Sequence, residues 1–335
     1  PQTEEARAEA LHLMGVLENM QTPKNAEPLI ASTQDFLTTF YLVTQKDFFL
    51  DRTHFFEYIS YFGDANERID VPPPTIFKPK ELWTGKQLFS LLLRPNRKSK
   101  VVINLDAKAR NFSRKFKTDE FRCPNDGFVI IRNSELLCGN IDKATIGNGS
   151  KNGIVFALLK DNNKKICAKV LTRISKFSAR WITNYGMSFG ISDVIPRADL
   201  IEQKEKLVDE SYRASDEQIA LYNDGKIQLK PGLNAEQSLE SALNGILSEV
   251  RETIGGYLRS ILPKSNSALI MAVCGSKGSD INLCQMIACL GQQIVNGNRM
   301  SNGFTNRTLP HFEEYSKYPA AKGFVRHSFY DGLSA

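Results

Sequence analysis

The spacing of apolar residues predicts a mainly helical chain, because such residues recur every three to four positions over several long stretches. The clearest series runs from Cys167 through Ile174 to Trp181 and predicts an amphipathic helix that Gly186 ends. Similar spacing, together with capping residues such as Thr3 and Thr84, predicts further helices at residues 4–17, 32–43, 53–62, 85–93, 199–222, 235–262 and 265–273.

The pattern changes in the middle of the first half of the chain, where short β-strands are predicted at residues 101–105 and 128–132. A tight turn at residues 132–134 leads into a further strand at 135–139, which predicts a β-hairpin. Residues 189–194 are expected to be extended. The sequence therefore combines a small sheet with many helices.

The composition shifts near residues 196–198, and a domain boundary is predicted there. Beyond it, two long polar helices at 199–222 and 235–262 are joined by a short loop, which predicts an antiparallel hairpin. Asn234 and Gln237 form a capping box for the second helix. The predicted fold class is α+β and mostly helical, with a mixed domain that holds a small β-hairpin sheet, followed by an α-helical hairpin domain.

The stretch 272–299 contains a glycine-rich break between two apolar helices. Gly275 and Gly278 flank Lys277, and glycine lets the backbone bend sharply and approach a ligand closely. Asp280 stands where a cap of the next helix is expected. On the residues alone, two interpretations stay open, a turn between helices and a contact with a phosphate or another anion.

Several smaller features of the chain are interpreted as local structure. Ser265 is expected to cap the helix at 265–273, and Gln292 and Gln293 stand where a C-terminal helix cap is expected. Residues 145–153 are rich in glycine and asparagine and predict a turn, because no Gly-Lys-Ser/Thr follows the glycine spacing.

The charge of the chain is mildly basic, with 43 Lys and Arg against 37 Asp and Glu and a net charge of +6. Residues 94–117 hold nine cations against Asp106 alone, a net +8 that leaves −2 on the rest. This run is either a solvated loop or a contact for nucleic acid or an acidic partner. The aromatic helix at 53–62 belongs to a core, a subunit contact or a base-stacking surface. The cations of the helix that Gly186 ends either face solvent or follow an anionic surface.

The residues that could carry catalysis or hold a metal are scattered. The 6 cysteines form no CxxC pair and the 4 histidines no ligand spacing, so no metal site and a reducing compartment are expected. Asp35, Asp47 and Asp51 are better explained by helix capping than by Mg²⁺ binding, and no nucleophile motif is present. No apolar run is long enough for a membrane span. The first residue is Pro1, so the chain is expected to be a piece of a longer protein.

Several segments of the chain resemble one family closely. They are CGSKGSDINLCQMIACLGQQ, GFTNRTLPHF and KGFVRHSFYDGL in the second half, and PQTEEARAEAL, PLIASTQDFLT and KPKELWTGKQLFS in the first. Together they resemble the largest subunit of eukaryotic multi-subunit RNA polymerases, in order and over essentially the whole chain. Stretches such as IRNSELLCGNIDKATIGNGSKNGI resemble RNA polymerase III more than RNA polymerase II.

The resemblance implies a map of the chain. It places the end of the double-psi barrel active-site domain at residues 1–22, the pore domain at 23–196, the funnel domain at 197–303, and a connector leading towards the bridge helix at 304–335. The implied function is to form the pore and funnel, or secondary channel, through which nucleotides reach the active site while small non-coding RNAs such as tRNA and 5S rRNA are made. The alternatives are the matching part of RNA polymerase II or I, or a non-catalytic module for subunit docking or nucleic-acid binding.

The resemblance also implies what belongs to the parent nucleotidyltransferase alone. The aspartate loop that holds the catalytic Mg²⁺ in this family, and any structural Zn²⁺, lie outside this sequence, so this piece is expected to bind no cofactor and to be inactive by itself. The implied partners are the second-largest and transcript-cleavage subunits, nucleoside triphosphates, and DNA and RNA in the whole enzyme, with no membrane. The implied location is the nucleus.

The resemblance finally implies site residues, none of them catalytic and none metal-binding. Lys277 matches the family lysine that approaches the triphosphate of the incoming nucleotide. Cys284 and Ile294 depart from the smaller or more polar residues of RNA polymerase II, so a weaker response to amatoxins is expected. The positions that match the amatoxin-binding surface near the bridge helix are Arg251, Ile281, Gln285, Gln292, Gln293, Gly297 and Arg299.

Overall fold

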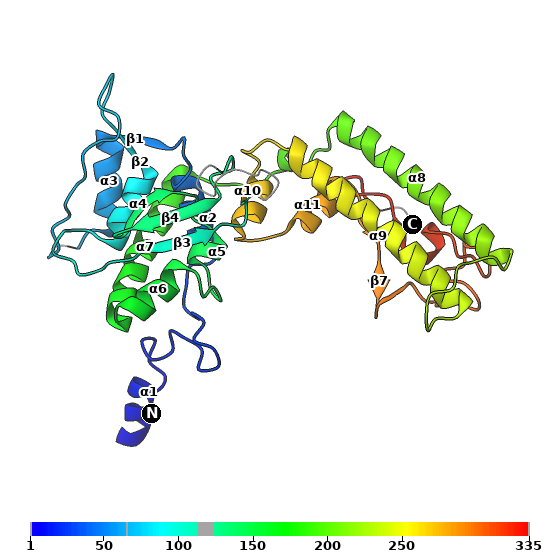
Figure 1. Cartoon of the computed structure of the whole chain (residues 1–335), viewed down its shortest axis with the longest axis horizontal. Helices are drawn as coiled ribbons and strands as arrows, with labels where there is room; N and C mark the ends of the chain where they lie inside the picture. Colours follow the sequence, from blue (N-terminus) through cyan, green and yellow to red (C-terminus); the bar gives the residue numbers. More distant parts are fainter. Residues whose placement is uncertain (1, 65, 113–122, 334–335) are drawn as a thin grey trace. The chain divides into compact units, whose positions relative to one another are not determined.

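A computed structural model describes residues 2–64, 66–112 and 123–333 of the chain (Figure 1). The chain forms two compact units. Unit 1 comprises Pro1–Ser188 with Ile270–Lys277, and unit 2 comprises Phe189–Leu269 with Gly278–Ala335. Within the described part, no helix combines the length and the apolar character that crossing a membrane requires.

Unit 1 combines helices with two small antiparallel sheets. Its helices are α1 (Glu4–His12), α2 (Asp35–Val43), α3 (Arg52–Phe62), α4 (Gly85–Leu93), α5 (Lys143–Ile146), α6 (Ile154–Asp161) and α7 (Lys164–Tyr185). Its strands are β1 (Phe49–Asp51), β2 (Leu82–Thr84), β3 (Leu105–Lys108), β4 (Phe128–Arg132) and β5 (Glu135–Cys138). Strand β1 pairs with β2, and β4 lies between β3 and β5.

The core of unit 1 forms along the apolar face of α7. Phe177 is fully buried, and its ring lies 5.8 Å from that of Phe40 on α2 and 6.2 Å from that of Phe62 on α3. Phe55 stacks on Trp83 at 5.2 Å. The aromatic helix α3 therefore places Phe55 and Phe62 in the core of its own unit, where aromatic side chains bury a large apolar area.

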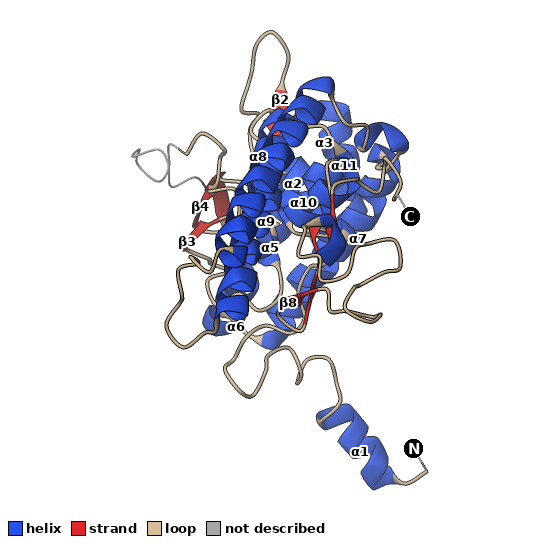
Figure 2. Cartoon of the chain, turned by 90° about the vertical axis from the view of Figure 1, so that its right-hand side faces the viewer, coloured by secondary structure: helices blue, strands red, loops and turns tan. Residues whose placement is uncertain are grey.

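Unit 2 is organised around two long helices that lie side by side, α8 (Ala198–Asn223) and α9 (Ala235–Ile261) (Figure 2). A row of leucines on α9, including Leu239, Leu243 and Leu247, is fully buried. The other elements are the 3₁₀ helices η2 (Ile191–Asp193) and η3 (Ala320–Lys322), helix α11 (Asp280–Ile287), and the strands β6 (Gly291–Gln292), β7 (Ile294–Val295), β8 (Asn298–Arg299) and β9 (Phe324–Val325). Strand β6 pairs with β9, and β7 pairs with β8. Helix α10 (Ser267–Cys274) has residues in both units.

The predicted fold class, α+β and mostly helical, is confirmed. The predicted caps Thr3, Thr84 and Asn234 each accept a backbone hydrogen bond at a helix start. The capping box of Asn234 with Gln237 is present. The hairpin between β4 and β5 is also confirmed, with Arg132 opposite Glu135.

Four local predictions were wrong in position or type. The strand expected at 101–105 lies at β3 instead, because residues near Ile103 bond to the Ser134 turn: the amide of Ile103 donates to Ser134 Oγ at 3.0 Å. The extended segment 189–194 contains the 3₁₀ helix η2, which the Gly190 amide closes by donating to Asp193 Oδ2. The turn expected at 145–153 is present but shorter, because residues 145 and 146 belong to the short helix α5 and the turn follows at 147–153.

The fourth correction concerns the start of α10. The residue that caps it is Asn266 and not Ser265, because Asn266 Oδ1 accepts the amide hydrogen of Leu269 at 2.9 Å. Asn266 also donates to the carbonyl of Asp193 at 2.8 Å. An amide side chain can accept and donate at once, which a serine one position earlier does not do here.

We expect Phe177→Ala to lower the free energy of unfolding of unit 1 by about 3–5 kcal/mol, because it removes a fully buried ring and leaves a cavity. Chemical denaturation followed by tryptophan fluorescence reports on this unit, since both tryptophans, Trp83 and Trp181, are buried in it. Phe56→Ala is the control, because Phe56 is exposed. Equal losses in the two variants would contradict the prediction.

Candidate functional site

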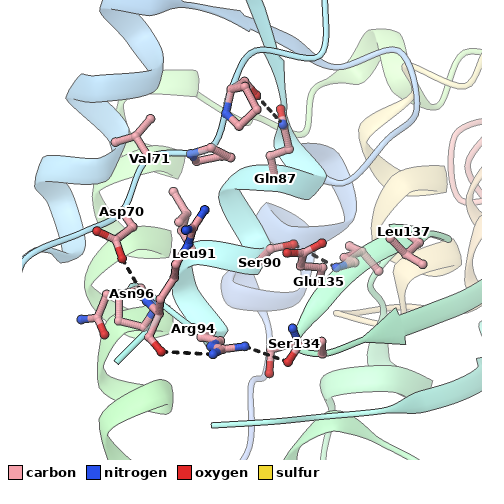
Figure 3. A pocket seen from close by; sticks show the side chains of 16 residues that line it. Asp70, Val71, Gln87, Ser90, Leu91, Arg94, Asn96, Ser134, Glu135 and Leu137 are labelled. Atoms are coloured by element: carbon pink, nitrogen blue, oxygen red, sulfur yellow. Dashed lines mark hydrogen bonds between the residues drawn. The ribbon is translucent and has the colours of Figure 1, made fainter. Parts of the chain in front are cut away.

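A cavity of about 680 Å³ lies in unit 1 between the strap 70–73, helix α4 and strand β5 (Figure 3). The guanidinium of Arg94 donates to Asn133 Oδ1 at 2.7 Å and to the carbonyl of Arg97 at 3.2 Å. Ser90 Oγ accepts the amide hydrogen of Leu136 at 2.9 Å. The walls thus bond mainly to one another. None of the site residues expected from the sequence lines this cavity.

The Lys277 turn, defined here as residues 275–279, follows α10 directly. Gly275 has φ +81° and Gly278 has φ +74°, a left-handed conformation that glycine adopts without steric cost. The amides of Gly275 and Ser276 both donate to the carbonyl of Met271 at 3.1 Å. These bonds close the C-terminal end of α10, so the chain leaves the helix in a fixed direction.

The side chain of Lys277 is exposed and forms no ion pair with any residue in the described ranges 2–64, 66–112 and 123–333. Its ammonium therefore keeps its hydrogen-bond donors available to a ligand. The turn that was expected at this position is present. Whether Lys277 also contacts an anion is a question about its function.

The start of α11 corrects the expected cap. Ser279 is the N-cap: its Oγ accepts the Asn282 amide hydrogen at 3.4 Å and donates to Asn282 Oδ1 at 2.6 Å. Asp280 lies in the first helical turn, where a carboxylate is favoured by the helix dipole. It pairs with Arg259 at 3.0 Å. Asp280 therefore supports the helix through charge and not through capping.

The C-terminal cap expected at Gln292 and Gln293 was also wrong. Helix α11 ends earlier, at Ile287. Gln292 belongs instead to strand β6, opposite Phe324. The amide of Gln293 donates to the carbonyl of Gly323 at 3.0 Å. The conformation of Gln292 and Gln293 is set by pairing with the distant strand β9. Residue patterns that mark the end of a helix carry no information on such pairing.

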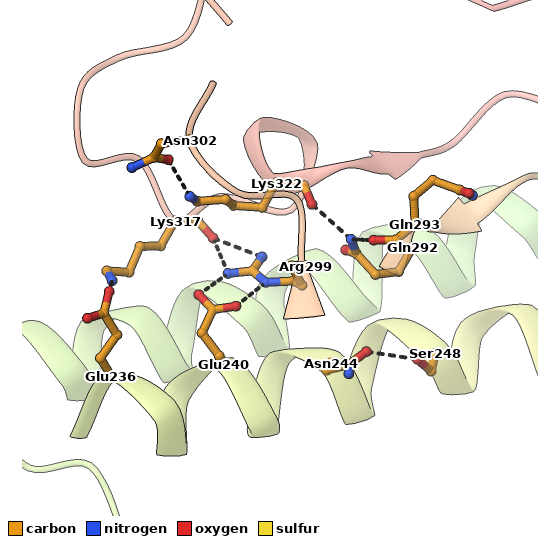
Figure 4. A network of polar contacts seen from close by, with 10 residues as sticks. All are labelled: Glu236, Glu240, Asn244, Ser248, Gln292, Gln293, Arg299, Asn302, Lys317 and Lys322. Carbon is orange, nitrogen blue, oxygen red and sulfur yellow. Dashed lines mark hydrogen bonds and ion pairs between the residues drawn. The ribbon is translucent and has the colours of Figure 1, made fainter. Parts of the chain in front are cut away.

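Arg299 forms the centre of a polar network in unit 2 (Figure 4). Its Nε and Nη2 donate to the two oxygens of Glu240 at 2.7 and 2.9 Å. Its Nη1 and Nη2 also donate to the carbonyl of Lys317 at 3.2 Å. Arg299 is buried, so these bonds hold the β8 strand and the 317 segment against α9. It is a structural anchor in this arrangement.

The Lys322 backbone extends the same network. Gln292 Nε2 donates to the carbonyls of Gln293 at 2.8 Å and of Lys322 at 2.9 Å. The Lys322 ammonium donates to Asn302 at 2.7 Å, and burial lowers the pKa of this lysine. The Oε1 atom of Gln292 is buried and accepts no hydrogen bond from any described residue. Sequence reasoning did not find Glu240 and Lys322, although Glu236 and Glu240 share one face of α9 at i, i+4 spacing.

Arg251 lies against the bare Cα of Gly291, since a Cβ built on that glycine would be 3.4 Å from Arg251 Cβ. Its carbonyl accepts the Cys284 thiol hydrogen at 3.7 Å. Cys284 is fully buried, whereas Ile294 is 44% exposed. Of these two residues, which the resemblance predicts to differ from RNA polymerase II, Ile294 is the one whose side chain is exposed to a ligand.

The remaining expected residues have separate surroundings. Ile281 is exposed on α11. Gln285, one turn later, accepts the Phe329 amide hydrogen at its carbonyl at 3.0 Å. Gly297 is exposed in the β7–β8 turn with φ +83°. Thus unit 2 brings Arg251 together with Gly291 and Cys284, while Arg299 and Gln292 belong to the polar network around Lys317 and Lys322.

The cations of α7 are mostly engaged within unit 1. Lys164 pairs with Glu18 at 2.7 Å and Lys176 with Asp64 at 3.0 Å. Arg173 is buried and donates to the carbonyl of Leu92 at 2.9 Å. These contacts account for Lys164, Arg173 and Lys176 without an anionic partner from outside the chain. In contrast, Lys165 and Lys169 are exposed. In the basic run 94–117, residues 114, 115 and 117 lie outside the described residues.

No arrangement for metal binding is present in the described ranges, because no group of three or more His, Cys, Asp or Glu side chains is suitably placed. The six cysteines are free thiols. Burial raises the pKa of the Cys167 thiol to about 12, so this residue acts as a small apolar side chain. The expected location of Mg²⁺ outside this sequence stays a prediction.

Comparison with known proteins identifies related chains. Residues 19–194 match the family model "RNA polymerase Rpb1, domain 3", and residues 219–325 match "RNA polymerase Rpb1, domain 4". The DNA-directed RNA polymerase III subunit RPC1 is 51% identical over 335 residues in Debaryomyces hansenii, 50% identical over 335 in Schizosaccharomyces pombe and 48% identical over 337 in Homo sapiens. Each alignment covers 100% of this chain but 23–24% of the relative, so the chain spans about a quarter of their length.

We expect Glu240→Ala to lower the free energy of unfolding of unit 2 by about 3–5 kcal/mol, because it leaves the buried Arg299 guanidinium without its carboxylate. Glu240→Gln should cost less, since its amide oxygen still accepts one hydrogen bond. Hydrogen exchange of the β7 and β8 amides measures the loss. Glu202→Ala, which removes an exposed i, i+4 partner of Lys206, is the control and should cost far less, because solvent screens an exposed ion pair. A loss no greater than that of the control would show that Arg299 does not depend on Glu240.

Proposed function

The chain belongs to the family of DNA-directed RNA polymerase III largest subunits, and from this we propose that it forms the pore and funnel through which nucleoside triphosphates reach the active site. In the whole enzyme this path serves the synthesis of small non-coding RNAs such as tRNA and 5S rRNA. The support is the identity of about half over the whole chain with subunits of that name. The location that follows is the nucleus.

The proposed domain map follows the resemblance. The pore is assigned to residues 23–196 and the funnel to 197–303, with the barrel end at 1–22 and the connector at 304–335. The antiparallel helices α8 and α9 supply a stiff funnel wall, because a buried leucine row joins them. Their exposed charged faces are the surface we assign to the transcript-cleavage subunit.

The observation that carries the nucleotide role is the state of Lys277. This lysine stands in a turn that two left-handed glycines shape, and it has no carboxylate partner among the described residues. A cation held in this way attracts the triphosphate and neutralises its charge without transferring a proton. Its role is substrate delivery, and the bond-making chemistry belongs to groups of the parent enzyme that bind Mg²⁺.

The competing proposal, a subunit-docking module, loses part of its basis. It relied on the aromatic helix at 53–62, yet Phe55 and Phe62 are buried within unit 1. Phe56 is the exposed ring of this helix that remains, with Arg52 5.6 Å from its centroid. Contacts with the second-largest subunit and with DNA or RNA remain part of the proposal for the whole enzyme.

We expect Lys277→Ala in the assembled polymerase to raise the apparent KM for nucleoside triphosphates about tenfold, with a smaller change in kcat. The reason is the loss of one charge-assisted contact to phosphate at an exposed position, of about 1.5 kcal/mol, which corresponds to roughly tenfold. Single-nucleotide addition at varied triphosphate concentration measures both constants. Lys160→Ala, which removes an exposed cation elsewhere in unit 1, is the control. An unchanged KM would contradict the assigned role of Lys277.

We also expect Ile294→Asn to strengthen amatoxin inhibition of the assembled polymerase by about two- to tenfold. An exposed polar side chain can add one hydrogen bond to the toxin, and such a bond contributes about 0.5–1.5 kcal/mol. The concentration for half-inhibition of transcript elongation is the measurement. Val295→Thr, which changes the next exposed strand residue, is the control. Equal or weaker inhibition after Ile294→Asn would show that Ile294 does not face the toxin.

A further inference from the structure

Gly275 has a second role besides its backbone conformation. A Cβ built on it would lie 3.1 Å from Arg110 Cζ and 3.0 Å from Lys143 Cβ, and it would overlap Arg110 Nη1. The guanidinium of Arg110 therefore rests against the backbone of the Lys277 turn, in space that any side chain at this position would fill. In contrast, a Cβ built on Gly278 would meet nothing within 4 Å. Gly275 thus leaves space for the Arg110 guanidinium, whereas Gly278 faces no described side chain.

Backbone hydrogen bonds fix the position of Arg110. Its amide donates to Asp142 Oδ2 at 2.6 Å, and the amide of Ala109 donates to the carbonyl of Gly127 at 2.8 Å. The segment that carries Arg110 is therefore held on the β-sheet side of unit 1. The fold of unit 1 therefore places the Arg110 guanidinium beside the Lys277 turn, and no flexible segment has to move to bring it there.

The guanidinium itself has no carboxylate partner among the described residues. The Asp142 carboxylate contacts the backbone of this segment, but it is almost fully buried. Its oxygens accept backbone hydrogens of Arg110, Ala144 and Thr145. Burial raises the pKa of Asp142, and no described hydrogen bond or ion pair joins its carboxylate to the Arg110 guanidinium. Other arginines of the chain differ in this respect: Arg132 and Arg299 each form two hydrogen bonds to a carboxylate.

We propose that Arg110 is a second phosphate-binding residue at the Lys277 turn and that Gly275 provides the space for it. The ligand chemistry is a chain of phosphoryl groups, as in a nucleoside triphosphate or in pyrophosphate. A planar guanidinium can donate two parallel hydrogen bonds to one phosphate, which an ammonium cannot do. Arg110 thus orients the phosphates, while Lys277 supplies a point charge. This inference rests on the proposed function.

The test uses the assembled polymerase with variants of this subunit, in two reactions. Single-nucleotide addition gives the apparent KM for nucleoside triphosphate, and pyrophosphorolysis gives it for inorganic pyrophosphate. We expect Arg110→Ala to raise the first KM about tenfold, with a smaller change in kcat. Arg110→Lys should lower the KM part of the way back, because lysine restores the positive charge but not the two parallel hydrogen bonds of a guanidinium. Lys160→Ala remains the control for net charge.

A glycine pair tests the packing. Gly275→Ala should raise KM as Arg110→Ala does, because a methyl group would displace the guanidinium. Gly278→Ala carries the same left-handed strain without that overlap, and should have a clearly smaller effect. In the Arg110→Ala background, Gly275→Ala should add less than it does alone. Equal effects of the two glycine variants would overturn the packing argument.

The outcomes separate this inference from the proposed function. A raised KM for Lys277→Ala with an unchanged KM for Arg110→Ala in both reactions would overturn the role of Arg110 and leave the function in place. An unchanged KM for both variants would overturn both. A rise after Arg110→Ala in the triphosphate reaction alone would support binding of the nucleotide. A rise in both reactions would support recognition of the phosphate chain shared with pyrophosphate.

Discussion

Burial of one face of α7 is the constraint on which unit 1 depends. Phe177 and Trp181 occupy this face one turn apart and are almost fully buried. Helices α2, α3, α4 and α6 all pack against it, so a large apolar area leaves water together. The Lys277 turn depends on this core indirectly, because Cys274 at the end of α10 is buried with its sulfur 3.9 Å from Thr38 Oγ1 on α2. The apolar pattern of α7 therefore also fixes the end of α10, from which the Lys277 turn starts.

In unit 2 the corresponding role belongs to α9. One face of this helix is apolar and packs on α8, while its polar positions hold the returning chain through Glu240 and Arg299. A buried arginine loses its hydration, so a matched carboxylate and carbonyl must replace the lost water. A substitution at Arg299 would therefore disturb the fold before it could report on a ligand. Resemblance placed Arg299 on an inhibitor surface, but its contacts give it a structural duty that resemblance did not predict.

The sequence predicted what local chemistry decides. Helix starts at Thr84 and Asn234 are correct because capping depends on a side chain and an amide three residues apart. The errors arose where a distant segment decides the structure, as when Gln292 pairs with β9 and not with the end of α11. Asn266 likewise replaced Ser265 as a cap, because it also bonds to Asp193. The turn around Lys277 was foreseen from its glycines, but the arrival of Arg110 beside it depends on long-range packing.

The difference between local sequence and long-range packing also explains why the number of cations in a segment is a poor guide to anion binding. Residues 94–117 look like one basic surface in the sequence, yet the guanidinium of Arg94 is engaged by Asn133 Oδ1 and by the carbonyl of Arg97. A cation whose donors are already bonded offers little to an anion, because breaking those bonds offsets the new attraction. An exposed cation without a carboxylate nearby keeps both its charge and its donors. By this criterion Arg110, which belongs to the basic run and lies beside Gly275, is a better candidate for phosphate binding than Arg94, whose donors are already engaged.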